Sequence, residues 1–411
     1  MRIGIVTTWF ERGAAYVSKQ YKEVLEKEND VFIYARGGEE FAIKDPLWNK
    51  GNITWGKQFK NSTRTKIDLK DFRNWVLSNE LEIVIFNEQH EWSPVIECDK
   101  MGVIIGAYID YYKKETVPFF HLYDFLFCNT QRHYSVFKNH FQAKYFPWGT
   151  NTDLFIPNEF IEIADKDCIQ FFHSAGMNPF RKGTDFVLRA AHSIITENFK
   201  LIIHSQVSLY QFFPENNLII NELIKAEKLQ VIDETISAPG LYKFYDVYLY
   251  PSRLEGIGLT VPEAISCGLP TVTTDQPPMN EFVKKDISGR LVKVDSVEKR
   301  SDNYFWSQSI ISVDSLKKEM LYYIVNREKI GLFKKKARNY ALENLDWVKN
   351  TSEINDYILS LKKNKDINKS EIIKNIKDYE RNRPFIYYLN TYKPYLKFKK
   401  IIKHYFKYNK K

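Results

Sequence analysis

The stretch SRLEGIGLTVPEAISCGLP, Ser252–Pro270, decides the fold class because it joins a strand signal to a helix signal through a glycine loop. The apolar run Val247–Tyr250 just before it predicts a buried strand. A helical pattern begins near Thr260, and Pro262 suits the first helical turn, where its missing N–H costs little. Gly268, two residues before a proline, predicts the end of that helix.

Two carboxylates stand in this stretch. Glu255 is expected on the loop, and Glu263 about one turn inside the helix. Gly256 and Gly258 let the backbone approach a ligand, and the N–H groups of Gly258 and Leu259 stand where the helix opens. Two hydroxyl acceptors at a fixed separation suit a ligand with diols at both ends and phosphates between, which describes a nucleotide-sugar. The alternative is a capping carboxylate followed by one solvent-facing glutamate.

The same alternation of apolar strand-like runs and helical patterns occurs twice, on either side of the polar stretch 151–166. Helices are expected near Tyr16–Glu28, near Leu69–Asn79, from Thr184, near Leu218–Glu227 and from Thr260. Near-continuous apolar strands between helices indicate parallel sheets buried on both faces. The sequence therefore predicts two doubly wound α/β domains.

We place these domains at residues 1–155 and 166–345, with a helix at 346–362 that crosses back to the first domain and a tail at 363–411. In such sheets ligands bind beyond the carboxyl ends of the strands, so the cleft between the two domains is the expected site.

A second motif, SAGMNPFRKGTDF, follows another predicted strand. Gly176 lies in its loop, and Arg181 and Lys182 immediately precede a helix. Two cations beside free backbone N–H groups suit a diphosphate. The alternative is a solvated turn, and a P-loop is excluded because the Walker A pattern is absent.

The charge balance argues against a nucleic-acid enzyme. The 411-residue chain has a net charge of +9, but residues 361–411 carry 16 Lys and Arg against 4 Asp and Glu, which leaves 44 against 47 for the rest. Because a nucleic-acid enzyme usually carries basic patches on its body, we expect no nucleic-acid partner.

The remaining composition predicts a cytoplasmic protein without a bound metal or other cofactor. No apolar run reaches the roughly 20 residues of a membrane span, and the N-terminus lacks a signal-peptide cleavage site. The histidines form no close ligand pair. The cysteines lie far apart, as expected for buried thiols in a reducing compartment: Cys98, Cys128, Cys168 and Cys267.

The tail carries nine aromatic residues and no acid after Arg383. On a helix its aromatic and apolar residues share one face: Tyr395, Phe398, Ile402, Tyr405 and Phe406. Its lysines lie largely opposite: Lys397, Lys400, Lys403 and Lys407. Such a basic amphipathic helix suits an anionic membrane surface, which we assign to residues 384–411. The alternatives are a packing arm, a solubilising extension and, less favoured, a nucleic-acid-binding arm.

Together these motifs resemble glycosyltransferase family 4, whose members are retaining enzymes of the GT-B fold with an E-x7-E signature. The matching segments are EGIGLTVPEAISCGLPTV, RKGTDFVLRA, GTNTDLF, TTDQPPMNEFV followed by SGRLVKVD, and MRIGIVTTWFERGAA. The resemblance covers about residues 1–360 and implies two Rossmann-like domains facing across a cleft, with the basic helical extension added.

The resemblance also implies roles for particular residues. Glu255 would contact hydroxyls of the transferred sugar, and Glu263 would bind the ribose. Lys182 would neutralise the donor diphosphate. Gly258 and Leu259 would present backbone N–H groups to the donor. Gly13 would lie near the diphosphate from the N-terminal side.

The chain departs from the family pattern in three places. One is Gly13-Ala14, where the family's N-terminal loop often has two glycines. Met177 follows Gly176 where the family usually has an arginine, so Arg181 is expected to supply the second cation. No histidine stands in register after the predicted strand EIVIF. Strand-end position alone suggests acceptor-side roles for Asn87, Glu88 and Asp110, and Asp110 equally suits a buried helix cap.

We therefore expect a metal-independent glycosyltransferase of cell-surface glycan synthesis that retains anomeric configuration. It would use a nucleotide-sugar and a saccharide or lipid-linked acceptor at the inner face of the membrane. The alternative is a non-catalytic nucleotide-sugar-binding or scaffold protein there. An NAD-dependent oxidoreductase is excluded because ERGAAYV lacks the GxGxxG pattern.

Overall fold

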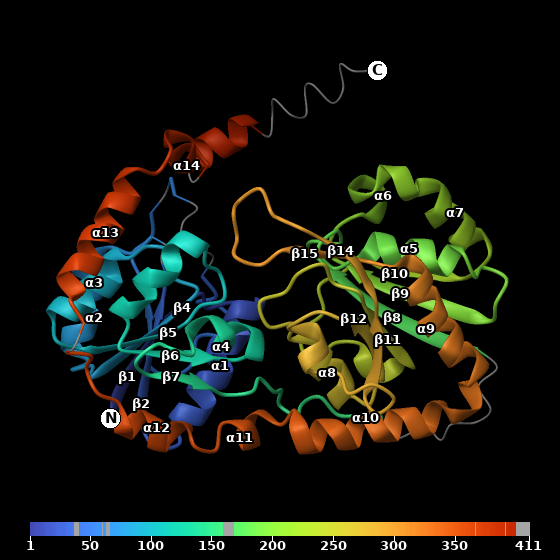
Figure 1. Cartoon of the computed structure of the whole chain (residues 1–411), viewed down its shortest axis with the longest axis horizontal. Coiled ribbons are helices and arrows are strands. Elements are labelled where there is room, and N and C mark those ends of the chain that lie inside the picture. The colour runs from blue at the N-terminus through green and yellow to red at the C-terminus, as the bar shows by residue number, and fades with distance from the viewer. Residues whose placement is uncertain are drawn as a thin grey trace. The chain divides into compact units, whose positions relative to one another are not determined.

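The computed structural model describes residues 1–36, 41–59, 61–62, 66–158, 168–365, 367–390 and 392–399. The chain divides into two compact units, shown in Figure 1. Unit 1 comprises Met1–Cys128, Val136–Lys144 and Glu353–Lys411, and unit 2 comprises Asn129–Ser135 and Tyr145–Ser352.

Unit 1 is built on a sheet in the order β3-β2-β1-β4-β5-β6-β7. Its strands are β1 (Arg2–Thr7), β2 (Asp30–Ala35), β3 (Ile53–Trp55), β4 (Ile83–Asn87), β5 (Ile104–Tyr108), β6 (Phe125–Cys128) and β7 (Ala143–Tyr145). Its helices include α1 (Gly13–Leu25), α2 (Leu69–Ser78), α3 (Ser93–Lys100), the 3-10 helix η1 (Lys114–Leu122) and the end of α4 (Gln131–Phe137), whose residues 131–135 are grouped with unit 2. The pairings from β3 through β6 are parallel, and the strand order reverses between β1 and β4.

Unit 2 repeats this plan with the order β10-β9-β8-β11-β12-β13. Its strands are β8 (Ile169–Gly176), β9 (Phe199–Ser205), β10 (Leu229–Ile232), β11 (Val247–Tyr250), β12 (Thr271–Thr274) and β13 (Gly289–Val292), followed by the antiparallel pair β14 (Val294–Glu298) and β15 (Gln308–Ile311). Its main helices are α5 (Thr184–His192), α6 (Leu209–Phe212), α7 (Asn217–Lys225), α8 (Thr260–Ser266), α9 (Val313–Val325), α10 (Ile330–Asn344) and α11 (Trp347–Asn350), with short 3-10 turns at η3 (Tyr242–Phe244) and η4 (Met279–Glu281). The order reverses between β8 and β11, so both sheets are doubly wound as predicted.

The strand–loop–helix predicted from Ser252–Pro270 is confirmed. All four residues of β11 are fully buried, as expected for a central parallel strand. Helix α8 begins at Thr260 and ends before Gly268, whose φ of +80° is the left-handed conformation of a helix stop. The Gly268 N–H bonds to the Ile265 carbonyl and the Leu269 N–H to the Ala264 carbonyl, which completes a Schellman motif.

The first expected helix was placed too late in the chain. The sequence predicts it near Tyr16–Glu28, whereas α1 spans Gly13–Leu25. The N–H groups of Ala15 and Tyr16 already bond to the Arg12 carbonyl, so the helix starts in the glycine loop itself. The side-chain periodicity of that loop is too short to indicate a helix.

The C-terminal extension adds α12 (Ile354–Ser360), α13 (Lys369–Arg381) and α14 (Phe385–Leu389) to unit 1. The fully buried carboxylate of Asp124 accepts hydrogen bonds from Asn364 N at 2.9 Å and Lys369 Nζ at 2.8 Å, and Ile376 is fully buried. Residues 363–365 and 367–381 therefore form a packed arm.

Only part of the tail beyond this arm can be described. Residues 393–399 are helical, Tyr392 pairs with Ser62, and both Phe385 and Phe398 are exposed. The predicted tail residues Lys400, Ile402, Lys403, Tyr405, Phe406 and Lys407 lie outside the described residues. Among the helices that the structure describes, none is long and apolar enough to cross a membrane.

Candidate functional site

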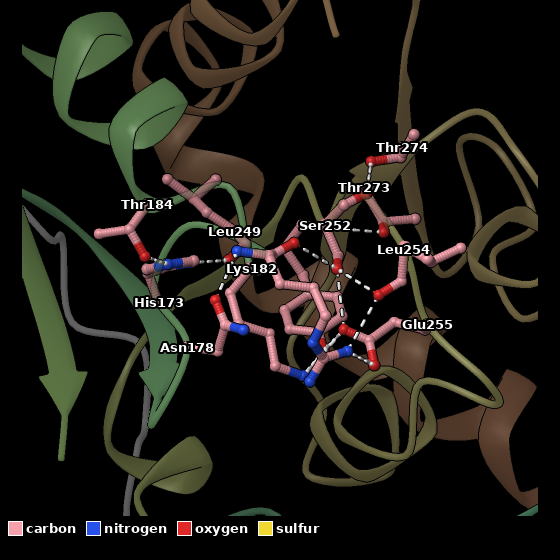
Figure 2. Close-up of polar contacts among 12 residues, drawn as sticks. His173, Asn178, Lys182, Thr184, Leu249, Ser252, Leu254, Glu255, Thr273 and Thr274 are labelled. Atoms are coloured by element: carbon pink, nitrogen blue, oxygen red, sulfur yellow. Dashed lines mark hydrogen bonds and ion pairs between the residues drawn. The ribbon is translucent and has the colours of Figure 1, made fainter. Parts of the chain in front are cut away.

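The candidate site lies in unit 2, at the carboxyl ends of the neighbouring strands β8 and β11. The sheet order reverses between these strands, which is where open parallel sheets bind ligands. One loop leads from β8 to α5 and carries Arg181 and Lys182, and the other leads from β11 to α8 and carries Glu255. Figure 2 shows the side chains of both loops converging.

Glu255 is buried at the centre of this cluster, with 7% of its surface exposed. Its Oε1 accepts hydrogen bonds from Tyr250 Oη at 2.7 Å, Ser252 Oγ at 2.8 Å and Lys182 Nζ at 2.9 Å. Its Oε2 accepts one from Arg181 Nη1 at 2.5 Å. Burial acts to raise the pKa of Glu255, but Arg181 and Lys182 outweigh it and hold the pKa well below its usual range. Glu255 is therefore an ionised counter-charge shared by both cations.

The two cations respond to this environment in opposite directions. Glu255 raises the pKa of Arg181, so the guanidinium stays charged. Burial lowers the pKa of Lys182 to about 8, with Glu255 opposing the decrease and Arg181 adding to it. Lys182 Nζ also donates to the Tyr250 hydroxyl and lies 4.8 Å from the centre of that ring. Lys182 is thus a charged group whose protonation state changes just above neutral pH.

Arg253 joins the two loops, a role that the sequence analysis missed. It is 4% exposed, and its guanidinium makes two hydrogen bonds to the Asp185 carboxylate, at 2.7 and 2.8 Å. The ring centres of Phe180 and Phe186 lie 3.9 and 3.8 Å from its guanidinium carbon. Its N–H bonds to the Arg181 carbonyl at 2.8 Å. The sequence shows only an arginine two residues before Glu255. Its position in a loop, outside any helical or strand periodicity, does not distinguish a buried arginine from a solvent-exposed one.

His173 lies beside the same region, at the left of Figure 2 next to Thr184. Its Nδ1 lies 2.8 Å from the Leu249 carbonyl and its Nε2 lies 2.7 Å from Thr184 Oγ1. Burial lowers the pKa of His173 to about 4, so the ring is neutral at physiological pH. It therefore links β8 to β11 and to the start of α5 without adding charge.

Two glycines allow the close approach of these loops. Gly183 precedes α5 with a φ of +75°, and a Cβ there would lie 2.1 Å from the Pro251 carbonyl oxygen. Gly258 precedes α8 with a φ of +90°. Both conformations are strained for residues with side chains.

Glu263 lies one turn into α8, as expected. Its Oε2 accepts a hydrogen bond from Tyr242 Oη at 3.0 Å. Burial raises the pKa of Glu263 to about 7, although Tyr242 and Lys182 oppose the increase. Glu263 and Lys182 thus interact electrostatically, which places the second glutamate of the pair within the influence of the cation cluster.

Of the other predicted site residues, some lie beside the cluster in unit 2 and the rest lie in unit 1. Gly176, with a φ of +55°, ends β8 next to the cluster, and Leu259 directly precedes α8. Gly13 is the first residue of α1 in unit 1. Asn87, Glu88 and Asp110 lie at the carboxyl edge of the unit 1 sheet, where β4 and β5 end.

The side-chain amide nitrogen of Asn87 is hydrogen-bonded within unit 1. Its Nδ2 donates to Thr7 Oγ1, the Ala14 carbonyl and Ser18 Oγ at 3.0, 2.7 and 2.8 Å. It therefore fixes the end of β4 against the start of α1.

Glu88, the next residue, has a φ of +47° and accepts a hydrogen bond from Asp110 N at 2.8 Å. Burial raises the pKa of Glu88, against the influence of Arg36 and Arg12. Glu88 and Asp110 therefore lie side by side at the carboxyl edge of the unit 1 sheet, beyond β4 and β5.

Comparisons with known proteins agree with this geometry. Residues 169–303, which contain the whole cluster, match the family model described as Glycosyl transferases group 1. A probable sucrose-phosphate synthase of Thermosipho melanesiensis is 26% identical over 191 residues, covering 44% of each chain. The O-antigen biosynthesis glycosyltransferase WclY of Escherichia coli is 30% identical over 129 residues, covering 28% of this chain and 36% of its own. The chain thus spans less than half the length of these curated relatives.

Solved structures resemble the chain over a greater length. A glycosyltransferase from Rickettsia africae has a TM-score of 0.68 at 13% identity, covering 87% of this chain and 98% of its own. Anabaena Alr3699/HepE in complex with UDP and glucose has a TM-score of 0.66 at 14% identity, covering 88% of this chain and 100% of its own. At these identities the likeness concerns the fold, which is GT-B.

Proposed function

We propose that the protein is a glycosyltransferase that moves a sugar from a nucleotide-sugar to a saccharide or lipid-linked acceptor in cell-surface glycan synthesis. The observation that carries the proposal is the cluster of Lys182 and Arg181 around the buried carboxylate of Glu255 at the β8/β11 switch point. The family match over residues 169–303 supports it. So do the structural neighbour bound to UDP and glucose and the relative named for O-antigen biosynthesis.

The role of Lys182 and Arg181 is to stabilise the leaving group. When the bond to the sugar breaks, negative charge develops on the departing diphosphate, and Lys182 and Arg181 stabilise it in a water-poor site. With these two charges in place the transfer needs no metal ion, which addition of EDTA tests directly. The protein's part in the reaction is therefore electrostatic.

The two glutamates hold the donor at either end. Glu255 orients both cations, and we assign its Oε2, which accepts from Arg181, to a hydroxyl of the transferred sugar as well. Glu263 accepts the hydroxyls of the ribose in its ionised form. The N–H groups of Gly258 and Leu259 stand at the open end of α8 and face the donor.

On the acceptor side we assign Glu88 and Asp110 of unit 1 as hydroxyl acceptors, with Asn87 supporting them through its contacts to α1. Retention of configuration follows when the acceptor attacks from the face that the diphosphate leaves, with a donor phosphate oxygen taking its proton. Product analysis by NMR distinguishes retention from inversion.

The proposal is tested by a thermal-shift screen of nucleotide-sugars, followed by transfer of radiolabelled sugar from each stabilising donor to crude lipid and glycan acceptors. We expect one donor class to stabilise and to transfer, and Lys182→Ala to lower the rate of transfer by about 10²–10³. Stabilisation without transfer to any acceptor would favour the non-catalytic nucleotide-sugar-binding alternative.

We also assign residues 384–411 to an anionic membrane surface at the inner face of the membrane. Among the described tail residues, Phe385 is 74% and Phe398 59% exposed. At about 1 kcal/mol per basic residue near such a surface, several lysines suffice for reversible binding. Deleting Pro384–Lys411 should release the protein from phosphatidylglycerol vesicles in a sedimentation assay, and continued binding contradicts this assignment.

A further inference from the structure

Arg132 is a buried arginine of unit 2 that the candidate site does not yet include. It is 9% exposed and lies in Asn129–Ser135, a segment grouped with unit 2 although the chain on both sides of it belongs to unit 1. Its guanidinium donates to the carbonyl of Glu255, to the carbonyl of Gly256 at 3.2 Å and to the carbonyl of Pro277 at 2.9 Å. Two of these three acceptors belong to the loop that carries the Glu255 carboxylate.

The segment around Arg132 is itself held in unit 2. The Glu281 carboxylate accepts hydrogen bonds from Gln131 N at 2.5 Å and Arg132 N at 2.9 Å. The Arg132 guanidinium carbon lies 4.9 Å from the centre of the Trp306 ring. The arginine is thus fixed at its backbone and at its side chain, which a residue needs if it is to hold another loop in place.

We propose that Arg132 is a positioning residue for the donor site: by binding the Glu255 and Gly256 carbonyls it keeps the Glu255 carboxylate against Lys182 and Arg181. It acts through the loop backbone, since none of its hydrogen bonds goes to a side chain of the cluster. The inference rests on the proposed function only for its consequence in catalysis.

The physical consequence is a change in the titration of Lys182. Glu255 is the main influence that raises the pKa of Lys182, against burial and Arg181, which lower it. If the Glu255 loop loosens, Lys182 loses this counter-charge and its pKa falls below about 8. A purely structural role for Arg132 reduces stability and leaves this titration unchanged.

Arg132→Lys is the test variant, because lysine keeps the charge but cannot donate to three carbonyls in a fixed planar fork. The matched control is Arg338→Lys. Arg338 also donates to three main-chain carbonyls in unit 2, those of Phe155, Ser266 and Thr152, at 3.0, 2.8 and 3.1 Å, and none of them belongs to the Glu255 loop.

The readout is the pH dependence of trace acetylation of Lys182 in the ligand-free, full-length protein, followed by peptide mass spectrometry. We expect half-titration to move to lower pH by at least half a pH unit in Arg132→Lys and to stay unchanged in Arg338→Lys. In the transfer assay we expect kcat to fall at least tenfold more in Arg132→Lys than in the control, per folded molecule.

An unchanged Lys182 titration in folded Arg132→Lys overturns the inference, as does an equal shift in the control. If Arg132→Lys does not fold, Glu281→Gln loosens the same segment and must shift the titration in the same direction. Because acetylation needs no substrate, these outcomes are independent of the proposed function, which fails separately if the wild-type protein transfers no sugar.

Discussion

Glu263→Gln should stabilise the ligand-free protein at alkaline pH while weakening its binding of donor. Burial raises the pKa of Glu263 from 4.5 to about 7. The folded state therefore favours the protonated acid more than the unfolded chain does. The free energy of unfolding falls as pH rises from about 4.5 to about 7, and the penalty is complete above that window. A neutral glutamine removes the penalty.

The magnitude follows from the displaced pKa. A pKa raised from 4.5 to about 7 corresponds to a cost of about 3 kcal/mol at pH 8.5 and about 1 kcal/mol at pH 5. The glutamine carbonyl can still accept the Tyr242 hydrogen bond, but its amide group needs a new partner in a partly buried place. We therefore expect a net gain of about 2 kcal/mol at pH 8.5, or roughly 4–8 °C in Tm for a unit of this size.

Calorimetric melts of the wild type, Glu263→Gln and the exposed control Glu343→Gln at pH 5 and pH 8.5 measure this gain. The variant should melt higher only at pH 8.5, and the control should match the wild type at both. An equal change at both pH values, or a loss of stability at pH 8.5, would refute the assignment of a destabilising buried charge. A residue that costs stability and improves donor binding is expected at a functional site.

Other expectations follow from the same cluster. Lys182→Ala should lower kcat by about 10²–10³, and the wild-type activity should fall as pH rises through about 8, a limb that Lys182→Arg removes in a pH–rate profile. Glu255→Gln should move that limb to lower pH, because the lysine loses its counter-charge. Gly183→Ala should prevent stable folding by contact with the Pro251 carbonyl, whereas Gly176→Ala, which meets no atom within 4 Å, should cost about 1–2 kcal/mol in a urea melt.

The local plan of the site was predictable from sequence because each part of it has a short-range signal. The buried strand Val247–Tyr250 is an unbroken apolar run, and α8 is bounded by Thr260 and Gly268. Glycine positions that require a left-handed backbone are among the few features that one residue type reports directly. These signals placed Glu255 on a loop and Glu263 in a helix.

The partners of these residues were not predictable, because they depend on which strands become neighbours. β8 pairs with the next strand, β9, and also with the distant strand β11. The second pairing brings Lys182 to Glu255, which are 73 residues apart in the chain. Sequence reasoning assigned both side chains to a ligand and missed that they bind each other. Arg132 was missed for the same reason. Its acceptors are main-chain carbonyls, which every residue type carries, so the sequence does not indicate them.

The pairing of Lys182 and Arg181 with one carboxylate explains how a buried site can wait for a charged ligand. Glu255 is ionised and neutralises one of the two cations, whereas Glu263, whose pKa burial raises to about 7, supplies a second negative charge only in part near neutral pH. A net positive charge therefore remains in a site of low polarity, which is costly. Tyr250 and Ser252 donate to Glu255 and so reinforce the anion, while they supply no second negative charge. In the proposed function a donor diphosphate would bring the missing charge, and its binding would relieve the excess without displacing Glu255. Under this proposal Glu255 would keep the cations oriented before and after the donor arrives, which is the preorganisation that electrostatic catalysis requires.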